Sequence, residues 1–139
     1  MPQAPQAYAE KPFDMAGQFL ANLDAQSAAE LITAASDVVL ILDKDGVIRD
    51  MALSNADMLS VGCQDWLGKS WLQTVTIESQ PKIEALLRTQ GAPTSDGVRW
   101  RQVNQVLGDG ADLPIAFSVA PIHNGQGARC VAFGRDLRP

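Results

Sequence analysis

The sequence predicts an α+β domain with a five-stranded antiparallel sheet, short helices on one face and an N-terminal helical arm. Three observations support this fold class. Two apolar runs, 38–42 and 47–53, surround an Asp-Lys-Asp-Gly turn; the middle third has helical spacing interrupted by glycines; and the last third holds three strand-like segments. At 139 residues, of which 46% are hydrophobic, the chain is expected to form one domain with a single core.

The first 36 residues divide into a tail and an arm. Residues 1–13 are rich in Pro, Gln and Ala, which predicts a flexible tail. Residues 14–36 are predicted to form the arm in two helical pieces, because apolar residues recur at helical spacing in both. These residues are Met15, Phe19 and Leu23, followed by Ala28, Leu31, Ile32 and Ala35. Ser27 and Glu30 have the spacing of a capping box for the second piece, and Asp24 is the alternative N-cap.

The two apolar runs at 38–53 predict a hairpin. Gly46 can supply the positive φ that ends a short turn with a bulge. Asp43 and Asp45 have the spacing of the first ligands of a calcium loop, but that loop needs Gly where Ile48 stands and Glu where Ser54 stands. The calcium interpretation is therefore excluded, and the two aspartates are expected to be solvated at the hairpin tip.

The helical middle is predicted in several pieces. Residues 54–74 contain Gly62 and Gly68 at short intervals, which favours two or three single-turn helices over one long helix. Residues 79–90 form a clearer helix, with Pro81 in the first turn and Gly91 at the end.

The last third predicts three strands, at 98–107, 113–122 and 129–137. Side-chain size alternates along the last two, which predicts one bulky face and one small face. The bulky face is assigned Ile115, Phe117, Val119, Val131 and Phe133, and the small face Ala116, Ser118, Ala120, Cys130, Ala132 and Gly134. The small face is expected to receive the arm, within one chain or from a second copy, the alternative being a thinly covered face. The predicted oligomer interface is Met15, Phe19, Leu23, Ala28, Leu31, Ile32, Ala35, Ala116, Ser118 and Ala132.

Composition and motifs exclude several functions. A net charge of −5 without a basic run argues against non-specific binding to nucleic acid or to anionic membrane. One histidine, His123 in a predicted turn, supports neither a catalytic triad nor a metal site, so we expect no enzyme, no metal and no cofactor. Two cysteines without a C-x-x-C pair favour a cytoplasmic location. Cys63 is a candidate redox residue, with a small buried hydrophobe as the alternative, and Cys130 is expected to be buried and inert.

The order of these elements resembles a PAS domain over residues 37–137. "SDVVLILDKDGVI" resembles the first two strands of that family, and "NADMLSVGCQDWLGKSW" resembles its N-x-a-x-x-x-x-x-G-y-x-x-x-x-l-G-k-s segment. The matching positions are Asn55, Gly62, Leu67, Gly68, Lys69 and Ser70. The family's flavin-binding members carry an N-C-R-F-L-Q segment where this chain has "QDWLGK", and its haem-binding members use a histidine on the longer helix, which 79–90 lacks. The resemblance therefore implies a sensor-type sheet without a bound chromophore.

A narrower likeness is to the amino-terminal PAS region of the PpsR/CrtJ repressors, which control photosynthesis genes in purple bacteria. "LITAASDVVLILDKDGVIRDM", "DWLGKSWLQTVTIESQPKIEALL" and "VAFGRDLRP" are the similar stretches. The likeness implies a self-associating, partner-binding piece of a redox- and light-responsive repressor, with a flavin- or cobalamin-binding antagonist protein as partner. It places DNA binding in a helix-turn-helix outside this sequence. A stand-alone PAS domain that senses a small ligand is the alternative.

Overall fold

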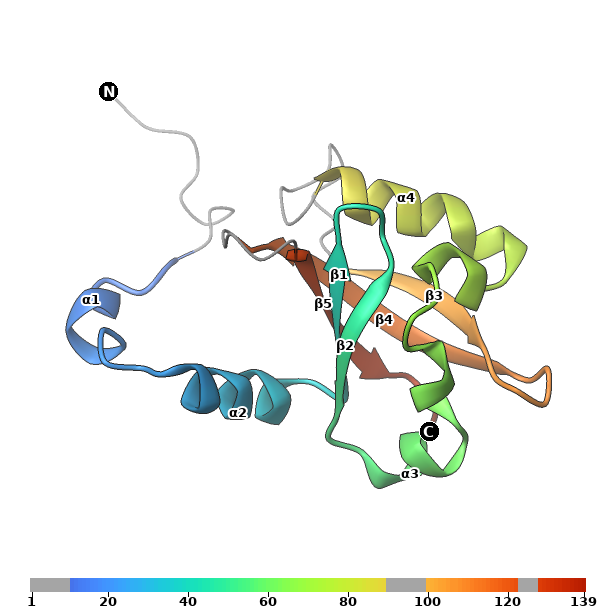
Figure 1. Cartoon of the computed structure of the whole chain (residues 1–139), viewed down its shortest axis with the longest axis horizontal. Helices are drawn as coiled ribbons and strands as arrows, with labels where there is room; N and C mark the ends of the chain where they lie inside the picture. Colours follow the sequence, from blue (N-terminus) through green and yellow to red (C-terminus); the bar gives the residue numbers. More distant parts are fainter. Residues whose placement is uncertain (1–10, 90–99, 123–127) are drawn as a thin grey trace.

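A computed structural model describes residues 11–89, 100–122 and 128–139, and the fold and its surfaces follow from those residues (Figure 1). The predictions for residues 1–10 of the tail, for the helix end at Gly91 and for His123 lie outside this part. The elements in chain order are α1 (Ala16–Phe19), α2 (Ala25–Ala35), β1 (Val38–Asp43), β2 (Ile48–Leu53), α3 (Ala56–Ser60), the 3-10 helices η2 (Cys63–Trp66), η3 (Trp71–Thr74) and η4 (Ile77–Ser79), α4 (Gln80–Thr89), β3 (Arg101–Val106), β4 (Asp112–Pro121) and β5 (Ala128–Asp136).

The five strands form one antiparallel sheet in the order β2-β1-β5-β4-β3. The hairpin β1–β2 turns at Gly46, where φ is 79°, and its register shifts between Ile41 and Leu42, as expected for a turn with a bulge. The expected α+β class and the five-stranded sheet are confirmed.

The core lies between the inner face of the sheet and the short helices α3, η2, η3 and α4. In Figure 1, α3 and α4 lie on one side of the sheet and α2 on the other. The fully buried side chains of the inner face include Leu40, Ile115 and Phe117, which pack against Met58, Trp71 and Ile83 of the helical layer. All short helices except those of the arm therefore cover a single face, as predicted.

Gly134 on β5 shows how tightly the inner face is packed. A Cβ at this position would lie 2.6 Å from Val38 Cγ1, 2.7 Å from Phe117 Cε1 and 2.9 Å from Ile115 Cγ2. Those distances are below van der Waals contact, so only glycine fits between the three side chains.

The arm differs from its prediction in two details. Its first helix, α1, has only four residues and begins after Met15 without a side-chain cap. The second helix is capped by Asp24, whose carboxylate accepts a hydrogen bond from the Ser27 backbone N–H at 2.8 Å. Asp24, the alternative, is thus the N-cap, and the Ser27 capping box is wrong because Ser27 already lies inside the helix.

Candidate interaction surface on the outer face of the sheet

The outer face of the sheet is more apolar than the sequence predicted. Cross-strand partners share a face, and β5 pairs Phe133 with both Val39 and Ser118, and Val131 with both Ile41 and Ala120. Bulky Val131 and Phe133 therefore lie on the outer face beside the small residues of β4.

The same register corrects the assignment of Ala132. Ala132 is the partner of Leu40 and of Val119, so its side chain points into the core and is fully buried. The predicted face of Ala116, Ser118 and Ala132 is wrong for Ala132, and Cys130 and Gly134 likewise lie on the inner face. Alternation by size was misleading because β5 carries its small residues inward, where the helical layer approaches.

Helix α2 lies over β1 and β2 on this outer face and leaves an apolar groove of about 490 Å³. Twelve residues line the groove, and most are apolar. From α2 come Ala25, Ala28, Ala29, Ile32 and Thr33, and from the sheet and its loops Val39, Ile41, Asp50, Met51, Ala52, Ile122 and Val131. The structure thus brings the predicted interface residues Ala28 and Ile32 against the sheet. Ala116 and Ser118 also lie on the outer face of the sheet, but on β4, and they do not line the groove.

The arm keeps several apolar side chains in solvent. Leu31 on α2 is 55% exposed and lines none of the grooves beside α2. Met15, Leu20 and Leu23 are 50%, 40% and 39% exposed, and no residue of α2 is buried. Ala35 is exposed too, whereas the Phe19 side chain lies outside the described part. An apolar helix with no buried residue has a surface left for a further contact.

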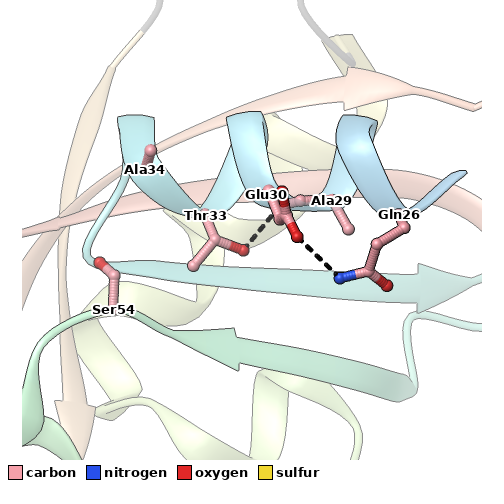
Figure 2. Close-up of a pocket in the computed structure, with 6 residues that line it drawn as sticks. All are labelled: Gln26, Ala29, Glu30, Thr33, Ala34 and Ser54. Carbon is pink, nitrogen blue, oxygen red and sulfur yellow. Dashed lines mark hydrogen bonds between the residues drawn. The ribbon is translucent and has the colours of Figure 1, made fainter. Parts of the chain in front are cut away.

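The side of α2 that adjoins the apolar groove is polar (Figure 2). There Gln26 Nε2 donates a hydrogen bond to Glu30 Oε1 at 3.1 Å, and Thr33 Oγ1 donates to the Ala29 carbonyl at 2.8 Å. These residues and Ser54 border an open groove of about 360 Å³. The helix is therefore amphipathic, and its polar side marks the direction from which a partner is not expected.

The β4 side of the outer face is more polar than the groove. The Arg135 guanidinium lies 4.5 Å from the centre of the Trp100 ring, a cation–π distance. Both residues are exposed, so this pair forms a polar border beside Ala116 and Ser118.

Asp43 was expected to be solvated, but it is buried. Its carboxylate accepts hydrogen bonds from the backbone N–H groups of Asp45 at 2.8 Å and Val47 at 3.0 Å, and from Arg49 Nε at 2.7 Å. The Val47 N–H, followed by the Arg49 side chain, lowers the pKa of this carboxyl below its usual value. Asp43 thus holds the hairpin turn together and is not a free surface charge.

Cys63 has the surroundings of a structural thiol. It is fully buried at the start of η2, and burial raises its pKa to about 11. Since the thiolate is the reactive form, such a group is poorly suited to redox chemistry near neutral pH. Cys130 is buried on the inner face, and neither cysteine forms a disulfide.

In residues 11–89, 100–122 and 128–139, no cluster of three or more His, Cys, Asp or Glu side chains is arranged to hold a metal ion. None of the helices in those ranges has both the length and the apolar character that a membrane crossing requires.

Comparison with known proteins places this fold. The family model described as "PAS fold" matches residues 32–138, which is more than half of the chain. The chain belongs to the PAS family. The match begins within α2, so the PAS unit as the family defines it includes the end of the arm.

Solved structures of PAS domains are similar at low sequence identity. A PAS domain from Colwellia psychrerythraea has a TM-score of 0.59 and 16% identity, over 81% of this chain and 95% of that one. The PAS domain of an HTR-like protein from Haloarcula marismortui has a TM-score of 0.52 and 16% identity, over 81% and 93%. VqmA of Vibrio cholerae, a dimeric LuxR-type receptor with a target DNA, has a TM-score of 0.51 and 16% identity, over 83% of this chain and 52% of its own length. No curated protein matches. These likenesses show the PAS fold, and some of the neighbours are regulators.

Sequence reasoning missed the contacts that fill the interior. The Trp71 indole, the Gln105 amide and Thr74 meet in the core, although 31 or 34 positions separate Gln105 from the other two. No local pattern predicts a contact of that separation; the signal available was a glutamine at an inward position of a strand.

Proposed function

We propose that this PAS domain is the self-association module of a PpsR/CrtJ-like transcriptional repressor, and that it binds by surfaces and has no catalytic activity of its own. In this proposal the outer sheet face and the arm join two or more copies. An antagonist protein is the second partner, and DNA binding belongs to a helix-turn-helix elsewhere in the repressor. The module acts in the cytoplasm, where a photosynthesis-gene repressor meets its DNA.

One observation carries the self-association part of the proposal. Helix α2 has apolar residues, covers an apolar sheet face, and yet buries none of its own side chains. Leu31 remains more than half exposed on the side that borders neither groove. A surface of this kind is stabilised when a second apolar surface removes it from water.

The rival function, sensing a small molecule in the interior, has less support. Trp71 and Phe117 occupy the space between the helical layer and the sheet, with ring centres 5.0 Å apart at an interplanar angle of 80°. Both side chains are fully buried. The grooves at the outer face are open to solvent and are better suited to a protein partner than to an enclosed ligand.

Deletion of residues 1–36 tests the proposal. We expect the wild-type chain to have the mass of a dimer or larger assembly by light scattering after size exclusion, and the deletion variant to have the mass of a monomer with its sheet intact by circular dichroism. Deletion of residues 1–13 is the matched control, because it removes the tail and keeps all predicted interface residues. An unchanged mass after deletion of 1–36, or a monomeric wild-type chain, would refute self-association through the arm.

A further inference from the structure

The centre of the PAS core is built around one indole. Trp71 is the first residue of η3 and is fully buried between that helix and the inner face of the sheet. The Phe117 ring on β4 meets it edge to face at 5.0 Å, an arrangement that aromatic rings favour. A flat aromatic group thus fills an enclosed space with an aromatic wall.

Polar groups converge on the indole N–H. Trp71 Nε1 donates a hydrogen bond to Gln105 Oε1 at 2.8 Å. Gln105 Nε2 in turn donates to Thr74 Oγ1 at 2.9 Å and to the Thr74 carbonyl at 3.2 Å. Because both acceptors lie on the nitrogen side of the amide, the amide oxygen must face the indole. The Gln105 side chain is therefore fixed as an acceptor aimed at the centre of the core.

This arrangement is not what packing alone requires. Gln105 is fully buried, and burying an amide costs free energy that an apolar residue of similar volume would avoid. Trp66 shows the simpler solution: its Nε1 donates to the Val106 backbone carbonyl at 3.2 Å, a group that any residue presents. An apolar enclosure with one or two oriented polar groups is instead the usual composition of a site for a small ligand.

We propose that Trp71 is a built-in ligand: its indole occupies a site for a flat aromatic molecule with an N–H donor, formed by Phe117, Gln105 and Thr74. The interior of this PAS domain is then permanently occupied, and its folded state does not depend on a small molecule from outside. The inference goes beyond the proposed function and is independent of it, since melting temperature and ligand binding test it and molecular mass does not.

Replacing the built-in ligand by a free one is the test. Trp71→Gly removes the indole, and indole is added at millimolar concentration while the melting temperature is recorded. Indole is expected to raise the melting temperature of Trp71→Gly and to leave that of the wild type unchanged. Benzofuran has nearly the same shape but no N–H, and we expect it to bind about tenfold more weakly by calorimetry, since it leaves Gln105 Oε1 without its donor. Adding Gln105→Leu to Trp71→Gly should remove this preference.

Two variants complete the design. Trp66→Gly also removes an indole, but the acceptor there is the Val106 backbone carbonyl at 3.2 Å. Its preference for indole over benzofuran should therefore be smaller and should not change when Gln105→Leu is added. Trp71→Phe fills part of the space without an N–H; it should melt below the wild type, with part of the loss recovered when Gln105→Leu is added. Four outcomes would each overturn the proposal. Two concern binding: Trp71→Gly binds indole and benzofuran equally, or Trp66→Gly prefers indole over benzofuran as strongly as Trp71→Gly does. Two concern stability: Trp71→Gly fails to fold with indole present, or Trp71→Phe is as stable as the wild type.

Discussion

Replacing Leu31 by Asp should weaken self-association strongly, because this residue is the most exposed large apolar side chain of α2. Full burial of a leucine side chain contributes about 1.5–3 kcal/mol. Leu31 is 55% exposed, so a partner that covers it completely adds about 0.8–1.6 kcal/mol per copy on that scale. In a two-fold dimer both copies contribute, which gives about 1.6–3.2 kcal/mol, or a Kd increased about 15-fold to 200-fold on loss of the contact.

The aspartate adds a second cost in the same direction. A carboxylate placed in an apolar contact must give up its hydration without gaining a partner, so the measured loss should reach or exceed the upper part of that range. Sedimentation equilibrium over a concentration series measures the Kd. Circular dichroism on each variant shows whether α2 and the sheet are still folded.

Ala34→Asp is the matched control for charge and helix propensity. Ala34 is exposed in the last turn of α2 and borders the same open groove as Glu30 and Ser54. The same new charge in the same helix should therefore leave the Kd within a few-fold of the wild type. If Leu31→Asp and the wild type have the same Kd, or if Ala34→Asp weakens association equally, the contact does not use the Leu31 side of α2.

Further predictions concern three residues of the folded chain. Gly134→Ala should lower the free energy of unfolding by about 1–3 kcal/mol in chemical denaturation, because it overpacks the core. Gly108→Ala is the control and should change stability little, because a Cβ there meets no atom within 4 Å. Equal effects of the two substitutions would contradict the packing described. Asp43→Asn should lower stability at neutral pH. The difference in stability between the wild type and this variant should shrink as the pH falls below about 4, because a carboxyl with a lowered pKa stabilises the fold only while it is ionised. A constant difference down to pH 2 would show that the charge of Asp43 is unimportant. With its pKa raised to about 11, Cys63 should resist iodoacetamide at pH 8 in the native chain and react on unfolding in urea, as followed by peptide mass spectrometry. That raised pKa also predicts that stability falls as the pH rises from about 9 toward 11, because the Cys63 thiol ionises at a lower pH in the unfolded chain than in the folded chain. Rapid labelling of Cys63 in the native chain at pH 8 would contradict both predictions for this residue.

The strands and helices could be predicted because their signals are local. The β1–β2 hairpin depends on Gly46 and its flanking apolar runs, and the broken helical segment that follows it depends on Gly62 and Gly68, both of which have positive φ. The N-cap of α2 was ambiguous for the same reason: Asp24 and Ser27 are both good caps three residues apart, and sequence alone does not rank them.

The faces of the sheet could not be predicted as well. Size alternation identifies the core face only when the other face is open to water, and here α2 covers part of the outer face. Val131 is buried on the outer face and Ala132 on the inner face, so both strand faces look apolar from the sequence. Pairing with β1 sets the register of β5. In that register position 134 faces the core, where Val38 and Phe117 approach so closely that only glycine fits.

Hydrogen bonds join the residues that follow α2 to the sheet. At the surface, the Asp37 backbone N–H donates to the Gly134 carbonyl at 2.9 Å, and the Asp37 carboxylate accepts from the Asp136 N–H at 2.7 Å. Ser54 at the end of β2 donates through its hydroxyl to the Ser36 carbonyl. Asp37, two residues beyond the end of α2, is thus bonded directly to the end of β5, so hydrogen bonds outside the core hold the base of the arm to the last residues of the sheet.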